Sequence, residues 1–247
     1  LGNAFKSLGQ LKDALISYEN ALKHNPDYAE AHNSIGLIFF EQKHYEKAIK
    51  SYQKAINFDQ NFANAHNNLG VVFNKIGQYD DAIHSYKNAL SIRTDYADAL
   101  NNLGVTYKKL GQFDNSIMSY EAALEINYDD ADTHNNLGIV FFELERFDDS
   151  INSYNNAIKI NPKMADAYNN LGHVLSGINQ YNEAINAYEK GFNINPNLDF
   201  ILGNILSSKM NSCNWNNLSS LQSNIIESLR ADNKKIIDPF SFMGLID

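Results

Sequence analysis

The sequence predicts an all-α protein, a solenoid in which helical hairpins stack one on the next. A pattern of residue types returns at a constant step of 34 residues. Each unit carries two stretches with apolar residues at helical spacing, and a short polar segment, often with Gly, separates them. Because one hairpin cannot bury both of its faces, stacking of neighbouring hairpins must supply the core.

The clearest mark of the repeat is a large aliphatic residue followed by Gly. This pair stands at Leu1-Gly2, Ile35-Gly36, Leu69-Gly70, Leu103-Gly104, Leu137-Gly138 and Leu171-Gly172. A column of Tyr keeps the same step, at Tyr18, Tyr52, Tyr86, Tyr120, Tyr154 and Tyr188. The pattern defines a partial first repeat and five whole repeats over residues 1–198, and the whole repeats begin at Ala29, Ala63, Ala97, Ala131 and Ala165.

The unit that begins at Ala63 shows why each half forms a helix. Leu69 and Phe73 lie on one face of a first helix, and Gly77 ends it because Gly tolerates a positive φ. A second apolar stripe that includes Tyr86 then forms the second helix. Small residues stand where the two helices approach closely, and the large ones fill the space that the small ones leave.

These columns resemble the tetratricopeptide repeat, whose pattern of Leu-Gly, Tyr, Ala, aromatic, Ala and Pro spans 34 residues. Pro26, Pro162 and Pro196 stand at the ends of units, as the pattern expects. The resemblance implies a right-handed superhelical solenoid whose first helices line the inner surface. It also implies a function in binding proteins or peptides on that surface.

The segment after the repeats continues the helical pattern. Residues 199–212 are predicted to form a half-repeat capping helix, with Leu202 and Ile205 in the first-helix pattern. A linker helix is expected over residues 216–230, with Asn216 as its N-cap. Its apolar face is formed by Leu218, Leu221, Ile225 and Leu229. An exposed stretch at Lys234–Pro239 should then become extended, since the residue before Pro avoids helix.

Composition excludes several classes of partner. The 29 acidic and 20 basic side chains give a formal charge of −9, which argues against nucleic acid and against an anionic membrane as partners. The single cysteine, Cys213, suits a reducing compartment. With no signal peptide or long apolar run, the expected location is cytoplasmic. Because the chain opens at Leu1 without Met, we expect an excerpt of a longer protein.

Residues that carry chemistry are not gathered anywhere in the sequence. His32, His66 and His134 recur at the repeat step, but one His per repeat is too widely spaced to share a metal ion, so we interpret them as packing residues. The chain also lacks a Gly-rich phosphate loop. We therefore predict no catalytic residue, no metal site and no cofactor within this chain.

A ladder of asparagines is the strongest functional signal. The two positions before each Leu-Gly hold Asn in nine cases of ten, with Ser34 as the exception. The predicted peptide-binding residues are Asn68, Asn102, Asn136 and Asn170, directly before the Leu-Gly pair, and then Asn67, Asn101, Asn135 and Asn169. The chain holds 36 Asn in total, so compositional drift is the alternative explanation.

The carboxamide suits this task because it offers both an acceptor and a donor. It can form hydrogen bonds with the C=O and N–H groups of a guest main chain whatever the side chains of the guest are. Packed helices lie about 8–10 Å apart, and an extended peptide advances roughly 3.3 Å per residue. One Asn per repeat would then meet the guest backbone at about every third residue.

A second column is mostly acidic and includes Asp98, Asp132 and Asp166, with Glu30 and Asn64 at the equivalent positions. Acids in the first turn stabilise a helix through its dipole, which is one explanation. The other is selection of basic or Ser/Thr-rich guests. In chaperone-binding relatives, Lys and Arg stand here and clamp a C-terminal carboxylate, so that function is not expected.

The tail resembles the junction in the O-linked N-acetylglucosamine transferase and Spindly family. There a repeat array with an asparagine ladder ends in a Cys-x-Trp element and one helix, as at Cys213-Asn214-Trp215 here, before a glycosyltransferase domain. The alternative is that Trp215 covers the end of the last hairpin. The resemblance carries over no catalytic residue, because the nucleotide-sugar half would lie beyond Asp247.

We therefore expect a protein-binding or peptide-binding scaffold, with residues 213–247 leading into a downstream catalytic domain. The finer hypothesis is the acceptor-recognition region of an O-glycosyltransferase that moves a sugar from a UDP-sugar to Ser or Thr. The chain alone is non-catalytic, and UDP-sugar is expected only for the downstream domain. The alternatives are a scaffold without enzymatic activity and a repeat region fused to a different transferase. A further hypothesis is a homodimer that forms through the exposed end of the repeat array.

Overall fold

The structure is a computed structural model that describes residues 1–230. Every regular element in this range is a helix, which confirms the all-α fold. The helices are α1 (Gly2–Ser7), α2 (Leu11–His24), α3 (Ala29–Glu41), α4 (Tyr45–Phe58), α5 (Ala63–Lys75), α6 (Tyr79–Ile92), α7 (Ala97–Lys109), α8 (Phe113–Ile126), α9 (Ala131–Glu143), α10 (Phe147–Ile160), α11 (Ala165–Gly177), α12 (Tyr181–Ile194), α13 (Ile201–Asn211) and α14 (Leu218–Arg230). The predicted extended segment at Lys234–Pro239 and the part of residues 213–247 after residue 230 lie outside the described residues.

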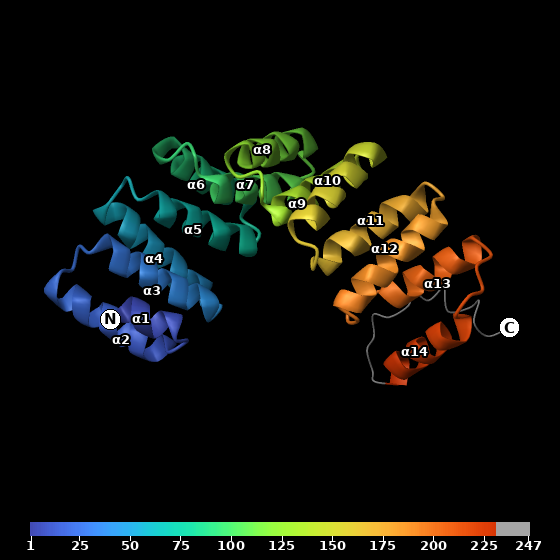
Figure 1. Ribbon diagram of the computed structural model, residues 1–247. Helices are drawn as coiled ribbons and strands as arrows, with labels where there is room; N and C mark the ends of the chain where they lie inside the picture. The colour runs from blue at the N-terminus through green and yellow to red at the C-terminus, as the bar shows by residue number, and fades with distance from the viewer. Residues whose placement is uncertain (231–247) are drawn as a thin grey trace. The chain divides into compact units, whose positions relative to one another are not determined.

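Each whole repeat is a helical hairpin, and its first helix begins at the residue that the spacing predicts. The helices form two compact units, Leu1–Tyr128 with α1–α8 and Asp129–Asp247 with α9–α14. Within each unit the hairpins follow one another in chain order (Figure 1). Each unit is therefore a stack of hairpins in which each helix packs mainly on its sequence neighbours.

The two faces of each unit differ in how closely the helices approach. In the first unit α3 contacts α5 and α5 contacts α7, and in the second unit α9 contacts α11 and α11 contacts α13. Within the described part of each unit, no second helix of a hairpin contacts the second helix of the next hairpin. The closely spaced first helices therefore form the inner face of each unit.

The Gly of each Leu-Gly pair is required by a close approach between the two helices of a hairpin. A Cβ placed on Gly70 would lie 2.6 Å from Cε1 of Tyr86, well inside van der Waals contact. Tyr86 is 1% exposed, and burial raises the pKa of its hydroxyl. The same contact recurs along the chain, so the Gly and Tyr columns are two sides of one packing interaction.

The turn inside each hairpin contains a residue in the left-handed region. Gly77 has φ +80°, as the turn prediction requires, and Gly9 and Gly111 behave alike. Lys43 and Glu145 stand at equivalent positions with φ of 60° and 57° although they carry side chains. The fold therefore imposes this conformation, and Gly only makes it easier to adopt.

Two serines replace Ala at the helix contact and satisfy their hydroxyls locally. Ser116 Oγ donates to the carbonyl oxygen of Gly104 at 2.8 Å, and Ser150 Oγ donates to that of Gly138 at 2.8 Å. Both serines are fully buried. The hydrogen bond allows a polar side chain to occupy a position that packing reserves for a small residue.

The tail differs from its prediction in two respects. Helix α14 begins at Leu218 and not at residue 216, so Asn217 and not Asn216 precedes it. Leu221 and Ile225 are buried as predicted, at 7% and 1% exposure. Trp215 is 59% exposed, so it does not cover the end of the last hairpin. Helix α14 contacts α13 instead and covers that end.

Candidate functional site

The predicted asparagines lie on the first helices, along the inner face of each unit. Asn67 and Asn135 are buried, at 7% and 8% exposure. The other six predicted residues are half-buried, namely Asn68, Asn101, Asn102, Asn136, Asn169 and Asn170. The 34-residue repeat therefore places one pair of amides at each first helix from α5 to α11.

The amides form hydrogen bonds from one repeat to the next. Asn68 Nδ2 donates to Asn33 Oδ1 at 3.0 Å, and Asn102 Nδ2 donates to Asn67 Oδ1 at 3.1 Å. In the second unit Asn170 Nδ2 donates to Asn135 Oδ1 at 3.0 Å. In these three cases the second Asn of a pair donates to the first Asn of the preceding repeat, and the bond joins neighbouring first helices of the same unit.

These hydrogen bonds add a second role to the one expected from the sequence, in which the amides bond a guest main chain. The sequence pattern gave no sign that each amide would also bond the neighbouring helix, because that depends on how two hairpins lie together. The hydrogen bond uses one of two N–H groups on the donor amide and one lone pair on the acceptor. The half-buried Asn68, Asn102 and Asn170 therefore keep amide groups with which a guest could bond.

The row of hydrogen bonds between asparagines does not continue to α13 in the second unit. Asn204, on α13, stands at the next ladder position, but its Nδ2 lies 3.2 Å from Nε2 of His173. Because Nδ2 can only donate, His173 accepts through this nitrogen. Loss of water around the ring lowers its pKa, in keeping with a neutral imidazole packed edge-on to Tyr188. Asn169 Oδ1 is left buried without a hydrogen-bond partner among the described residues.

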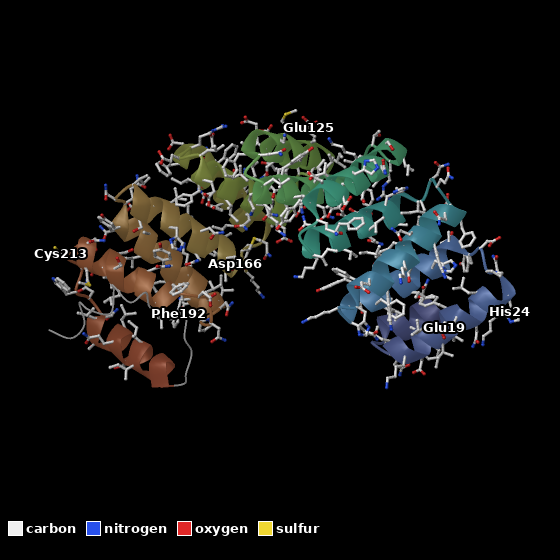
Figure 2. The ribbon with its side chains drawn as sticks, turned by 180° about the vertical axis from the view of Figure 1, so that it is seen from behind. Glu19, His24, Glu125, Asp166, Phe192 and Cys213 are labelled. Carbon is white, nitrogen blue, oxygen red and sulfur yellow. The ribbon has the colours of Figure 1, made fainter. Side chains whose placement is uncertain are left out.

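The acidic column does not form a cluster. Asp98, Asp132 and Asp166 are exposed, and each lies in the first turn of its own helix. Figure 2 shows Asp166 at the start of α11. Their positions agree with stabilisation of helix N-termini, and selection of a guest by these acids stays a prediction.

An apolar strip that was not predicted from the sequence lies beside the amides. Leu37, Val71 and Val105 in the first unit and Ile139 in the second lie one helical turn after the first Asn of each pair. All four are half-buried. They keep the same 34-residue step as the ladder, and this periodicity was the signal that could have identified them. The inner face therefore combines amides with aliphatic side chains.

The histidines of the repeat column serve packing. His32 is 8% exposed, its Nε2 lies 2.9 Å from the carbonyl oxygen of Pro26, and its ring stacks on Phe58 at 5.3 Å. Within residues 1–230 no group of three His, Cys, Asp or Glu side chains could hold a metal ion. Cys213 is exposed with a free thiol. None of the helices described here has the length and apolar character to cross a membrane.

The fold and the inner face define a helical-hairpin repeat protein whose amide ladder joins successive repeats. Comparison with family models identifies the family. The model described as "TPR repeat" matches residues 2–43, 36–77, 72–111, 106–144 and 140–177, and the model described as "Tetratricopeptide repeat" matches residues 165–198. The chain belongs to the tetratricopeptide repeat proteins. A comparison with curated proteins finds no match.

Several solved structures share this fold. YrrB, described as a TPR protein with an unusual peptide-binding site, is 21% identical with a TM-score of 0.62, over 78% of this chain and 97% of that chain. MamA is 25% identical with a TM-score of 0.61, over 68% of this chain and 92% of that chain. The APC/C hetero-tetramer Cut9–Hcn1 gives 19% identity and a TM-score of 0.77, over 100% of this chain and 48% of that chain.

Proposed function

We propose that the inner face binds an extended segment of another protein and holds it by its main chain. The observation that carries the proposal is the row of amides, one pair at each first helix at the repeat step. An amide donates and accepts at once, as a peptide group does. A row of amides at a constant step therefore matches the repeating main chain of an extended guest.

The surroundings of the amides support the same function. The aliphatic strip beside them would remove apolar side chains of the guest from water, which supplies affinity that hydrogen bonds alone do not. The hydrogen bonds between amides fix their side chains before a guest arrives. A preorganised site loses less conformational entropy on binding than one made of free side chains.

The similar structures are consistent with this proposal. YrrB is described as having a peptide-binding site, and Cut9 is described within a hetero-tetramer. These structures also fit the alternative named from the sequence, a scaffold that performs no chemistry itself. Binding of another protein is common to all versions of the proposal.

The test is binding of extended peptides to the whole chain, measured by fluorescence anisotropy. Peptides of about 12 residues would span the inner face of the first unit, at about three residues per repeat. The inner-face variant carries Asn68→Ala and Asn102→Ala, and the control carries Asn152→Ala and Asn155→Ala, two exposed positions on the second helix α10. We expect about tenfold weaker binding for the inner-face variant and no change for the control.

Because the inner-face substitutions also remove hydrogen bonds between repeats, each variant is first melted and binding is measured where its helix content equals the parent's. Equal affinity of parent and inner-face variant would overturn the proposal. So would a loss of the same size in the outer control.

A finer proposal is that this scaffold recognises acceptors for an O-linked glycosyltransferase that uses a UDP-sugar. It is supported by the resemblance at Cys213-Asn214-Trp215 and by the amide ladder. Neither the family models nor the similar structures add support to it. The test is transfer of sugar from UDP-N-acetylglucosamine to Ser or Thr of a bound peptide by the natural protein. Binding without transfer would leave the scaffold as the whole function.

A further inference from the structure

A small cavity opens on the inner face of the first unit, between α3, α5 and α7. Its volume is about 130 Å³. Phe40, Val71, Val105 and Tyr86 form its apolar lining. An apolar protein cavity of about 150 Å³ can hold a benzene molecule, so this one has room for a single aliphatic side chain. It lies beside Asn102, a member of the ladder.

The polar wall of the cavity is held in place by neighbouring groups. Asn74 Nδ2 donates to Thr106 Oγ1, and Asn74 Oδ1 accepts from Lys109 Nζ at 2.6 Å. Thr106 is fully buried and donates to the carbonyl oxygen of Asn102 at 2.8 Å. These bonds connect α5 with α7 and fix the shape of the cavity before any guest arrives.

Two lysines place positive charge at one end of the cavity. Lys75 lines it, and Lys109 is bonded to its wall; both are exposed in the last turns of α5 and α7. A cation at a helix C-terminus stabilises the helix. Glu41 and Glu143 stand at the same repeat position in α3 and α9, so the fold does not require Lys here. Among the described residues neither lysine forms an ion pair within 4 Å.

The chemistry of the cavity is confined to the first unit. Three repeats further along, His173 stands in place of Val71, and Ser207 stands in place of Val105. Gly177 replaces Lys75 at the same step. The equivalent positions therefore lack both the aliphatic lining and the charge, although the ladder position and the Tyr are kept. The helical repeat by itself does not account for this combination of residues.

We propose that this cavity is a side-chain subsite that takes one aliphatic residue of the guest, with an Asp or Glu of the guest within two residues of it. The inference rests on the proposed binding of an extended peptide at the ladder. The cavity excludes water around the aliphatic side chain, and the two lysines attract the carboxylate. Successive side chains of an extended peptide are about 3.3 Å apart along the chain, so both contacts are within reach of one short segment.

The test compares Gly/Ser-rich peptides that differ only at two adjacent central residues. Leu-Asp should bind the whole chain about 10- to 30-fold more tightly than Ala-Asp, because three buried carbons are lost. It should bind about two- to fivefold more tightly than Leu-Asn, because an exposed ion pair is lost. Equal affinities for all three peptides would overturn the subsite.

Two variants, each with a matched control, separate the subsite from general peptide binding. Lys75→Glu introduces the residue found at Glu41 and Glu143, so the fold should accept it, and it should shift the preference from Leu-Asp toward Leu-Lys. Lys54→Glu, an exposed change on α4, should leave the preference unchanged. Val105→Gln should abolish discrimination between Leu and Ala, whereas Ile139→Gln, one repeat further on, should keep it.

The outcomes distinguish the two proposals. If peptides bind and lose affinity with the Asn68→Ala and Asn102→Ala variant but show no preference for Leu-Asp, the subsite is wrong and the proposed function stands. If Lys75→Glu leaves the preference unaltered, the assignment of the lysines is wrong. If no peptide binds at any tested concentration, both proposals fail together.

Discussion

The hydrogen bond between the side-chain amides of Asn102 and Asn67 allows a prediction of how the ladder contributes to stability. Asn102→Ala removes the N–H group that donates to Asn67 Oδ1 at 3.1 Å. Asn67 is 7% exposed, so water cannot readily replace the lost donor. The substitution therefore removes a hydrogen bond and leaves a buried acceptor without a partner.

The expected size follows from these two effects. A typical hydrogen bond contributes about 1 kcal/mol, and an unsatisfied buried group costs about 1–3 kcal/mol. Asn102→Ala should thus lower the free energy of unfolding by about 1–3 kcal/mol. Replacing both partners by Ala should cost less than the sum of the single changes, with a coupling of about 1 kcal/mol. Asn115→Ala is the control, because its amide bonds Gln112 Oε1 at a similar 3.1 Å but at an exposed position, and it should cost under about 0.5 kcal/mol.

The assay is urea unfolding of five proteins, followed by far-ultraviolet circular dichroism: the parent, Asn67→Ala, Asn102→Ala, the double variant and Asn115→Ala. Because the stability of a repeat array is close to a sum of repeat and interface terms, the curves are fitted with a term for the α5–α7 interface. Equal effects of Asn102→Ala and Asn115→Ala, or a coupling of zero, would refute the reasoning. The amides would then not join the repeats.

Three further predictions concern packing, turns and the end of the ladder. Gly70→Ala should lower the free energy of unfolding by about 1–3 kcal/mol, because its Cβ would enter the facing Tyr ring, whereas Gly177→Ala meets nothing within 4 Å and should not destabilise. Lys43→Gly should raise the free energy of unfolding by up to about 1 kcal/mol, because φ at this position is 60°. The midpoint of urea unfolding measures each of these changes. The pKa of His173 is lowered in the fold. The contribution of His173 to the free energy of unfolding is therefore present above pH 6.5 and is lost as pH falls through the folded pKa. His173→Val should remove this pH dependence of the melting temperature and the hydrogen bond between Asn204 Nδ2 and the His173 ring.

The sequence predicted the helices well, because each boundary depends on local and repeated signals. The whole repeats begin at Ala29 and at each later step, as expected from the Leu-Gly and Tyr columns. The contact between Gly70 and Tyr86 was also implied by the sequence, because a small residue packs opposite a large one and this pairing recurs in successive repeats.

The candidate site was predicted only in part. The asparagines were found because they recur at one step, but the hydrogen bond from Asn102 to Asn67 joins residues 35 apart and depends on how two hairpins lie together. The cavity beside Val105 was missed for a different reason. Val105 belongs to the periodic aliphatic strip, but its combination with Asn74 and Lys75 occurs once among residues 1–230, so no periodicity marks the cavity itself. Periodic features can be inferred from a sequence, and a feature that breaks the period needs the structure.

The most direct measurement of the central claim is an N-methyl scan of a bound peptide. N-methylation removes one main-chain N–H of the guest and changes no side chain, so it probes whether the amides hold the backbone. We predict that affinity falls about tenfold at positions spaced by about three residues, and little at the positions between them. A flat scan, with equal affinity for every methylated peptide, would contradict main-chain recognition by the ladder.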